Sequence, residues 1–270
     1  DKNPQQFLKA GISLQNLAGT FTDGKRKYYN LFLHGEYRNK TKNKKWDIEA
    51  YGKFYLAGFN NADFDLSASL KRVISKKLGA IQLGMQNVNR TPSFIFDNAS
   101  SFSLGNQPTF NKENITRIFG GLENEAGRWR LSASYYLVSN YTYFYDYYKT
   151  AQESGLFNVL ELNAQKTFRV GKRWHWLARV QMQQRAGNGP VNLPLFFTHH
   201  RFGYEGTLGF KNLRFAAGLE GRYHSAYKAD QYSPLQSRFF YQDEQTISMK
   251  LPEIAAYLHF RIRGFATYIR

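Results

Sequence analysis

Histidines are the side chains best suited to acid–base or metal chemistry in this sequence of 270 residues, which has six histidines and no cysteine. His199 and His200 are adjacent, but adjacent residues of a strand point to opposite faces and rarely bind one ion together. His34, His175 and His259 fall on the polar faces of the strands expected below, whereas a serine hydrolase in a barrel wall needs its histidine on the lipid side. The sequence therefore predicts no metal site, no catalytic residue, no cofactor and no enzymatic activity.

Arginines at alternate positions could act as fixed charges without covalent chemistry. The sequence has 37 Lys and Arg against 20 Asp and Glu, which gives a formal net charge of +17. Nucleic-acid-binding proteins concentrate such charge on one face or one helix, but here it is dispersed, so no nucleic acid partner is expected. If the polar faces of the strands line a lumen, its arginines favour anions over cations. The residues expected to line this pore are Arg128, Arg130, Arg179, Arg185, Arg214, Glu220, Arg222, His259, Arg261 and Arg263.

In an alternative interpretation, these arginines lie on the polar faces but have no net effect on ions. In this alternative they pair with glutamates of neighbouring strands and only neutralise a polar interior. The glutamates available for such pairs are Glu161, Glu205, Glu220 and Glu253. Arg117 is expected near one end of the strands, away from this set.

A cluster of tyrosines could bind a sugar or a peptide, because a Tyr ring gives rigid contact area with a polar tip. The chain contains 19 Tyr and 23 Phe, and the candidate loop-binding residues are Tyr141, Tyr143, Tyr145 and Tyr147. Two alternatives stay open for this loop: it extends an interfacial aromatic belt, or it packs against neighbouring loops. The segment 225–252 allows the same interpretations and is also long enough to fold inward as a constriction.

Strands must position these side chains, because polar and apolar residues alternate with period two almost throughout the chain. From Arg214 to Tyr223, for example, one face is charged and the other is apolar. The runs have the length of tilted strands that cross a membrane. We expect strands at 7–17, 28–38, 45–56, 63–72, 77–88, 113–123, 128–139, 156–169, 173–185, 200–210, 213–224 and 253–263, with another beginning at Phe265. The pattern at 113–123 is too mixed to assign its faces.

The connections alternate in length, which indicates a meander with different ends. Short turns are expected at 39–44, 73–76, 124–127, 170–172, 211–212 and around Gly264. Long loops are expected at 18–27, 89–112, 140–155, 186–199 and 225–252, and the connection at 57–62 is short where a long one is due. Outer-membrane barrels have short periplasmic turns and long extracellular loops. No run of about 18 apolar residues occurs, which excludes an α-helical membrane protein.

Tryptophans support a membrane interface at the end with the short turns. Trp46, Trp129, Trp174 and Trp176 each follow a short turn within a few residues, and all four fall on the apolar faces of their strands. An amphipathic ring is favoured at the level of the lipid headgroups. We therefore expect these four residues to lie at one membrane interface.

The C-terminal segment 251–270, LPEIAAYLHFRIRGFATYIR, resembles the putative porin family of Bacteroidota, whose members carry a similar Pro-acidic-apolar segment, a basic alternating strand and a final aromatic strand. This resemblance implies an outer-membrane barrel with a porin-like role and transfers no functional residues. Family members are typically longer at the N-terminus, and their terminal strand continues beyond a position like Arg270. Bacterial single-chain barrels also have an even number of strands. Residues 1–270 are therefore expected to form a single barrel domain that is incomplete at one or both ends.

The fold class expected from the sequence is an all-β transmembrane antiparallel meander barrel of the outer membrane. The leading functional hypothesis is a porin-like channel for passive diffusion of small hydrophilic solutes, with a mild anion preference. One alternative is a non-conducting barrel that acts as a structural or docking subunit of an envelope complex. Another is a soluble all-β binding protein such as a lectin. The expected partners are outer-membrane lipid and lipopolysaccharide, small hydrophilic or anionic solutes, and other envelope proteins.

Overall fold

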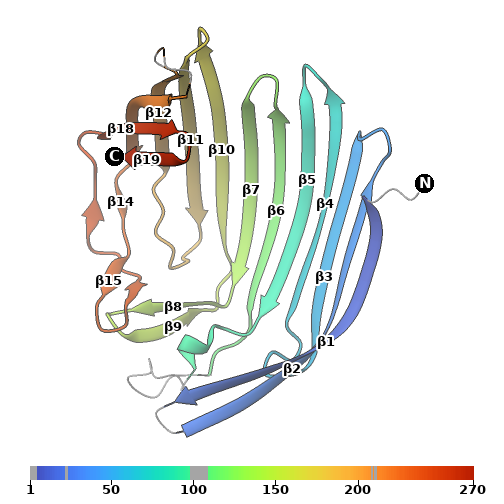
Figure 1. Ribbon diagram of the computed structural model, residues 1–270. Coiled ribbons are helices and arrows are strands. Elements are labelled where there is room, and N and C mark those ends of the chain that lie inside the picture. Colours follow the sequence, from blue (N-terminus) through green and yellow to red (C-terminus); the bar gives the residue numbers. More distant parts are fainter. Residues whose placement is uncertain (1–4, 22–23, 98–108, 208, 210–211) are drawn as a thin grey trace.

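The computed structural model describes residues 5–21, 24–97, 109–207, 209 and 212–270, and their main feature is one curved antiparallel sheet (Figure 1). This sheet has 13 strands in the order β1-β2-β3-β4-β5-β6-β7-β10-β11-β12-β13-β18-β19, so each strand pairs with the next large strand along the chain. The strands are β1 Gln6–Phe21, β2 Gly24–Lys40, β3 Trp46–Gly58, β4 Phe64–Ser75, β5 Gly79–Arg90, β6 Glu113–Asn124, β7 Trp129–Ser139, β10 Phe157–Val170, β11 Trp174–Ala186, β12 Phe196–Gly206, β13 Arg214–His224, β18 Glu253–Ile262 and β19 Phe265–Ile269. The predicted all-β meander is confirmed.

The two ends of the sheet differ as predicted, with one correction. Short turns gather at the upper end in Figure 1, and the long connections after β5, β7 and β13 lie at the lower end. The predicted loop at 18–27 is wrong, because β1 continues to Phe21 and β2 begins at Gly24. Lys25 and Lys27 pair with residues of β1 there.

Strand β12 also differs from its predicted position at 200–210, because it spans Phe196–Gly206. Phe197 pairs with His224 at the start of this strand, and Gly206 pairs with Phe215 at its end. The aromatic pair at its beginning gives no period-two signal by itself, so the strand was predicted to begin at His200. The connection to β13 is correspondingly longer than the predicted turn at 211–212.

Small secondary structures occupy the long loops, where the sequence predicted none. The β7–β10 loop contains the hairpin β8 Tyr141–Tyr145 and β9 Lys149–Glu153. The β13–β18 loop contains two short pairs, β14 Tyr227–Lys228 with β17 Thr246–Ile247, and β15 Gln231–Ser233 with β16 Arg238–Phe240. A single 3-10 turn, η1 Phe94–Phe96, lies in the β5–β6 loop. No helix in the described residues is long and apolar enough to cross a membrane.

Apolar side chains of the sheet lie on its outer face, which no other layer of the described chain covers. Leu8 is 75% exposed, Ile12 is 63% exposed and Leu219 is 55% exposed. The described part of the chain has few buried hydrophobic residues, namely Ala80, Val138, Phe144, Phe157, Phe240 and Tyr257. A soluble protein would need the apolar face inside a core, so the soluble alternative does not fit this structure. Lipid is the solvent that this face requires.

Tyr257 is an exception, because it is buried on the inner face, the face opposite the apolar one. Gly203 of β12 pairs with Gly218 of β13, and Gly218 pairs with Tyr257 of β18. The Tyr257 ring lies over both glycines, since a Cβ at Gly203 would come 1.9 Å from its hydroxyl and one at Gly218 would come 2.8 Å from it. An aromatic ring that covers glycines fills the space that side chains would otherwise occupy and supplies packing contacts there.

We expect Gly218→Ala to destabilise the folded protein by about 1–3 kcal/mol, because the added methyl group overpacks a filled site. Its Cβ would also come 2.2 Å from the Phe202 carbonyl oxygen. Gly221→Ala on the same strand is the matched control, since its Cβ would come no closer than 4.0 Å to the Glu253 carbonyl oxygen. The temperature at which the folded band disappears on a semi-native gel measures the difference. Equal temperatures for the two variants would contradict the role of Tyr257.

Candidate functional site on the inner face

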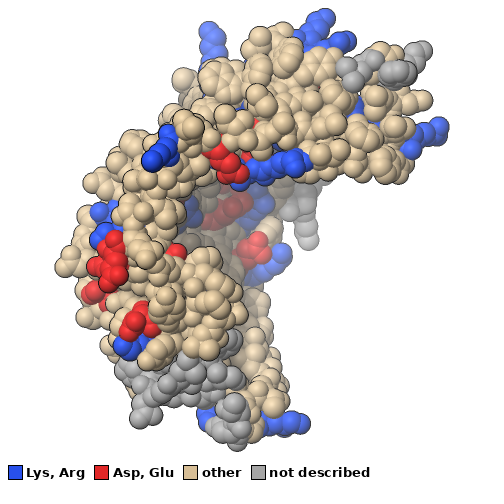
Figure 2. Space-filling model, turned by 90° about the vertical axis from the view of Figure 1, so that its left-hand side faces the viewer, with Lys and Arg blue, Asp and Glu red and all other residues tan. Residues whose placement is uncertain are grey.

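Charged side chains line the inner face of the curved sheet, and Figure 2 shows acidic and basic residues along its hollow side. Cross-strand pairs fix which predicted residues share this face, because directly paired residues point to the same side. Arg179 pairs with His199, His199 pairs with Arg222, and Ala216 pairs with His259. The strand positions place the following predicted residues on the inner face: Arg130, Arg179, Arg185, Arg214, Glu220, Arg222, His259 and Arg261.

Two of the predicted pore-lining arginines lie outside the strands. Arg128 is in the turn before β7 with φ of 52°, and Arg263 is in the turn between β18 and β19. The tight hairpin connection takes these residues out of the alternation, because a turn with positive φ does not continue the pleat. Both arginines are therefore at the end with the short turns.

Glu220 of β13 is the centre of the densest ion-pair cluster described on this face. Its Oε1 lies 2.7 Å from an Arg222 guanidinium nitrogen, 2.9 Å from His199 Nε2 and 3.4 Å from an Arg270 guanidinium nitrogen. The residue is only 8% exposed. Buried carboxylates are stable when they are paired and hydrogen-bonded, and this one has three basic partners.

The expected pairing of arginines with glutamates is confirmed only in part. Glu205 lies 3.7 Å from His175 rather than from an arginine, and Glu161 accepts a hydrogen bond of 2.5 Å from Asn163. On the strands nearer the N-terminus, Arg38 lies 3.1 Å from Asp47 and 3.0 Å from Glu49. Glu123 pairs with both Lys71 and Arg130, the latter at 2.9 Å. Most carboxylates of the inner face are therefore already paired.

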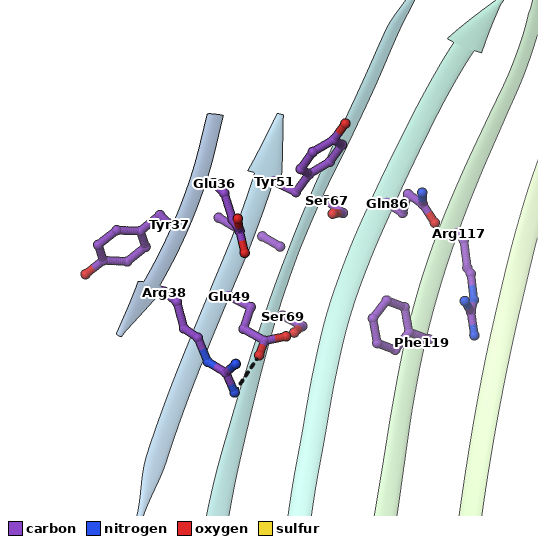
Figure 3. Close-up of a pocket in the computed structure, with 12 residues that line it drawn as sticks. Glu36, Tyr37, Arg38, Glu49, Tyr51, Ser67, Ser69, Gln86, Arg117 and Phe119 are labelled. Atoms are coloured by element: carbon purple, nitrogen blue, oxygen red, sulfur yellow. Dashed lines mark ion pairs between the residues drawn. The ribbon is translucent and has the colours of Figure 1, made fainter. Parts of the chain in front are cut away.

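Arg117 of β6 has no carboxylate partner among the described residues, although it lines the same hollow as Glu36 and Glu49 (Figure 3). Its guanidinium carbon lies 4.7 Å from the Phe119 ring centroid and 5.5 Å from that of Tyr136. It donates hydrogen bonds of 3.0 and 3.3 Å to Ser134 Oγ. Rings and a hydroxyl hold the guanidinium in place without neutralising its charge.

Two hollows of the inner face adjoin at Arg117. One has a volume of about 350 Å³ and includes Glu36, Arg38 and Glu49 in its lining. The other has a volume of about 550 Å³ and includes Lys71 and Arg130 in its lining. Both are lined by Arg117 and Phe119, so the Arg117 guanidinium borders both hollows.

Other inner-face arginines also have no carboxylate partner within the described ranges, and Arg179 and Arg201 are two examples. Arg179 donates hydrogen bonds of 3.0 and 3.2 Å to Gln165 Oε1. The Arg201 guanidinium lies 4.2 Å from the centre of the Tyr257 ring. Together with Arg117, these residues leave the inner face with positive charge that its carboxylates do not cancel.

The sequence predicted Arg179 as a pore-lining residue but missed Arg117 and Arg201. Arg117 was expected near one end of the strands, and the faces of its own strand were not assigned. The spacing of Arg117 and Glu123 could have placed it, because residues six positions apart in a strand lie on the same face. Glu123 pairs with Arg130 of the next strand, which was already predicted to line the pore. Arg201 lies within the predicted strand at 200–210, but the faces of this strand were not assigned from the sequence, so the residue was not placed on the inner face.

The four tryptophans lie on the outer face at the end with the short turns, as predicted. Trp46, Trp129 and Trp174 are the first residues of β3, β7 and β11. Trp174 stacks on Phe202 with ring centroids 5.1 Å apart, and Trp176 stacks on Phe168 at 5.0 Å.

The predicted tyrosine cluster is in the β8–β9 hairpin, with Tyr141, Tyr143 and Tyr145 on β8 and Tyr147 in its turn. Two of these four residues pack against a neighbouring loop. Tyr143 and Tyr241 have ring centroids 5.8 Å apart, and Tyr147 and Phe240 have theirs 4.8 Å apart. Burial raises the pKa of Tyr141 and of Tyr143 above the usual value for a tyrosine.

Comparisons with known proteins agree with this architecture. A family model described as "Putative porin" matches residues 3–270. No curated protein matches the sequence. Among solved structures, the chain is similar to one from the FpvAI–pyocin S2 complex, with a TM-score of 0.53 and 11% identity over 89% of this chain and 34% of that chain. The chain thus spans about a third of the length of that protein, and the likeness shows the fold alone.

Another similar structure is OmpT, an outer membrane protein of Vibrio cholerae that was folded in vitro. Its TM-score is 0.28 and its identity is 11%, over 99% of each chain.

We expect Glu220→Gln to lower the free energy of unfolding by about 1–3 kcal/mol, because three basic groups lose the one charge that they share. Glu36→Gln is the matched control, since Glu36 is 51% exposed at its side chain and its one ion pair among the described residues is with Lys9 at 3.6 Å. An exposed pair of this kind contributes less than about 1 kcal/mol. Urea titrations in phospholipid vesicles, followed by tryptophan fluorescence, measure both variants. A larger loss for Glu36→Gln than for Glu220→Gln would contradict this assignment.

Proposed function

Because the chain belongs to the family described as "Putative porin" and lies in the outer membrane, we propose that it lines a water-filled path through which small hydrophilic solutes diffuse passively, anions more readily than cations. The observation that carries this proposal is that several inner-face arginines, among them Arg117, Arg179 and Arg201, have no carboxylate partner among the described residues. No covalent chemistry is assigned to them.

The mechanism that we propose is electrostatic. An anion that enters the lumen leaves part of its hydration shell, and fixed guanidinium groups offset this cost while they raise it for a cation. Paired residues such as Arg38 and Glu49 make the wall polar but add little net field. Arg117 therefore contributes more to selectivity than an arginine whose carboxylate partner is in contact.

The outer face is proposed to contact lipid and lipopolysaccharide. Trp46, Trp129, Trp174 and Trp176 would form an aromatic belt at the periplasmic interface, since short turns mark that side of an outer-membrane barrel. Their rings would lie at the level of the headgroups, with the leucines of the same face in the hydrocarbon.

A closed wall is proposed to need strands beyond the thirteen described. Among the described residues, β1 pairs only with β2, and β19 pairs only with β18. The free N–H and C=O groups of such edges are too costly to leave unpaired in a bilayer. We therefore propose that residues 1–270 form one barrel domain whose edges pair with further strands.

Conductance through planar bilayers tests this function. We expect the purified protein, extracted in its native form, to give stepwise currents whose reversal potential under a salt gradient favours anions. In Arg117→Gln and in Arg179→Gln the reversal potential should move towards zero, because each variant removes one uncompensated charge. Arg72→Gln is the matched control, since Arg72 lies over the Trp46 ring on the outer face, 4.6 Å from its centre.

The absence of current from protein shown to be folded would overturn the channel. It would favour a structural or docking subunit of an envelope complex, which is the alternative function. Currents with no anion preference, or equal shifts in Arg72→Gln and Arg117→Gln, would overturn the role of the arginines while leaving the channel in place.

The anion preference should also weaken as salt increases, because the Debye length falls from about 10 Å at 0.1 M to about 3 Å at 1 M. Measurements of the reversal potential at a constant salt ratio, with the lower concentration raised stepwise across this range, give the dependence. A preference that stays constant would point to selection by contact at a narrow site rather than by the field of the lumen.

A further inference from the structure

Two long loops on the same end of the sheet are joined into one folded unit. The Tyr241 N–H donates a hydrogen bond of 2.7 Å to the Phe144 carbonyl oxygen, and Tyr145 and Tyr241 form a parallel β-bridge. The Gln236 side chain donates a hydrogen bond of 3.0 Å to the Tyr148 carbonyl oxygen. The β7–β10 loop and the β13–β18 loop therefore hold each other in place near the lower end of the sheet (Figure 1).

Backbone strain in this unit is balanced by packing. Asp146 and Tyr147 form the β8–β9 turn with φ values of 47° and 66°, a conformation that Asn and Gly usually adopt. A bulky side chain at positive φ is an outlier that persists only where surrounding contacts fix it. Tyr147 packs on Phe240, which is only 4% exposed. This ring contact ties the turn of the β8–β9 hairpin to the other loop.

A cleft with a volume of about 320 Å³ lies between the joined loops. Several of its lining residues come from distant parts of the chain, namely Phe96 of η1, Tyr141 and Tyr143 of β8, Asp230, Phe239 of β16, and Tyr241. Its size is at the lower end of the range of small-molecule sites, roughly 300–1,000 Å³. It fits one or two rings of a larger ligand.

The lining combines ring faces with uncharged hydroxyls and a carboxylate. Phe239 is 66% exposed, which leaves its ring free to contact a ligand. The hydroxyls of Tyr141 and Tyr143, which both line the cleft, can donate as well as accept hydrogen bonds. Asp230 accepts one described hydrogen bond, of 2.9 Å from Asn192, and a carboxylate can accept several more.

We propose that this cleft binds a neutral saccharide at the outer surface of the cell. A pyranose ring has an apolar C–H face, which packs on an aromatic ring, and a rim of hydroxyls, which pair with Asp230 and the tyrosine hydroxyls. The acidic Asp230 and the basic Arg238 both line the cleft, so it carries little net charge and suits a neutral ligand. Long loops of an outer-membrane barrel face the exterior, where glycans occur. The site does not depend on the proposed ion path.

Binding of defined oligosaccharides to the whole protein tests this proposal. The probes are maltotetraose, cellotetraose, laminaritetraose and mannotetraose, observed by saturation-transfer NMR and titration in a detergent whose headgroup is not a sugar. We expect at least one probe to bind, with its affinity reduced about tenfold or more in Tyr143→Ala and in Asp230→Asn. Tyr148→Ala is the matched control, because Tyr148 is an exposed tyrosine of the same hairpin that does not line the cleft.

Tyr143→Phe guards against a variant that only disrupts the loops, because it keeps the ring packed on Tyr241 and removes the hydroxyl. We expect it to bind more weakly than wild type but more tightly than Tyr143→Ala. The proposal would be overturned if none of the four probes bound, or if the Tyr143 variants and Tyr148→Ala bound alike. Binding of a tryptic casein digest in place of the saccharides would identify a peptide site instead.

Discussion

The placement of side chains on the sheet depends on the backbone hydrogen bonds between neighbouring strands. In a bilayer each N–H and C=O group must find its partner inside the protein, because lipid offers none. The hydrogen bonds of the sheet meet this requirement for the strands between its two edges, β1 and β19. The register of these strands then decides which side chains face lipid and which face water. Arg179, His199 and Arg222 lie in one row for this reason, since they are paired across three strands.

The sequence predicted most of this ladder because alternation is its direct consequence. Strands whose outer residues are Leu, Ile, Ala or Trp were found within a few residues of their bounds, as at Trp174–Ala186. The strand at Phe196–Gly206 was misplaced, because its first residues show no alternation. Its start is fixed instead by pairing with the neighbouring strand, where Phe197 lies opposite His224. The strand Glu113–Asn124 was found but not oriented, since Ile115 and Phe119 break the polar pattern of its inner face.

The candidate sites were predictable to different degrees. Alternation shows which arginines lie on the inner face. It does not show whether a carboxylate neutralises each one, because that depends on the residues of the neighbouring strands. Glu220 attracts Arg222 and His199, whereas Arg201, which is paired with Glu220 in the register, lies over Tyr257 instead. The tyrosine cluster was visible in the sequence, but its contact with Tyr241 joins loops about a hundred residues apart and carries no local signal.

The scarcity of buried side chains has a consequence for how such a chain can change over evolutionary time. At most wall positions a substitution needs only to keep the polarity of its face, because lipid or water adapts to a new shape in a way that a packed core does not. Many sequences therefore encode the same wall, and chains of common ancestry can lose recognisable sequence similarity while their shape persists. Positions with fixed neighbours, such as Gly203 and Gly218 beneath Tyr257, are where we expect the slowest divergence.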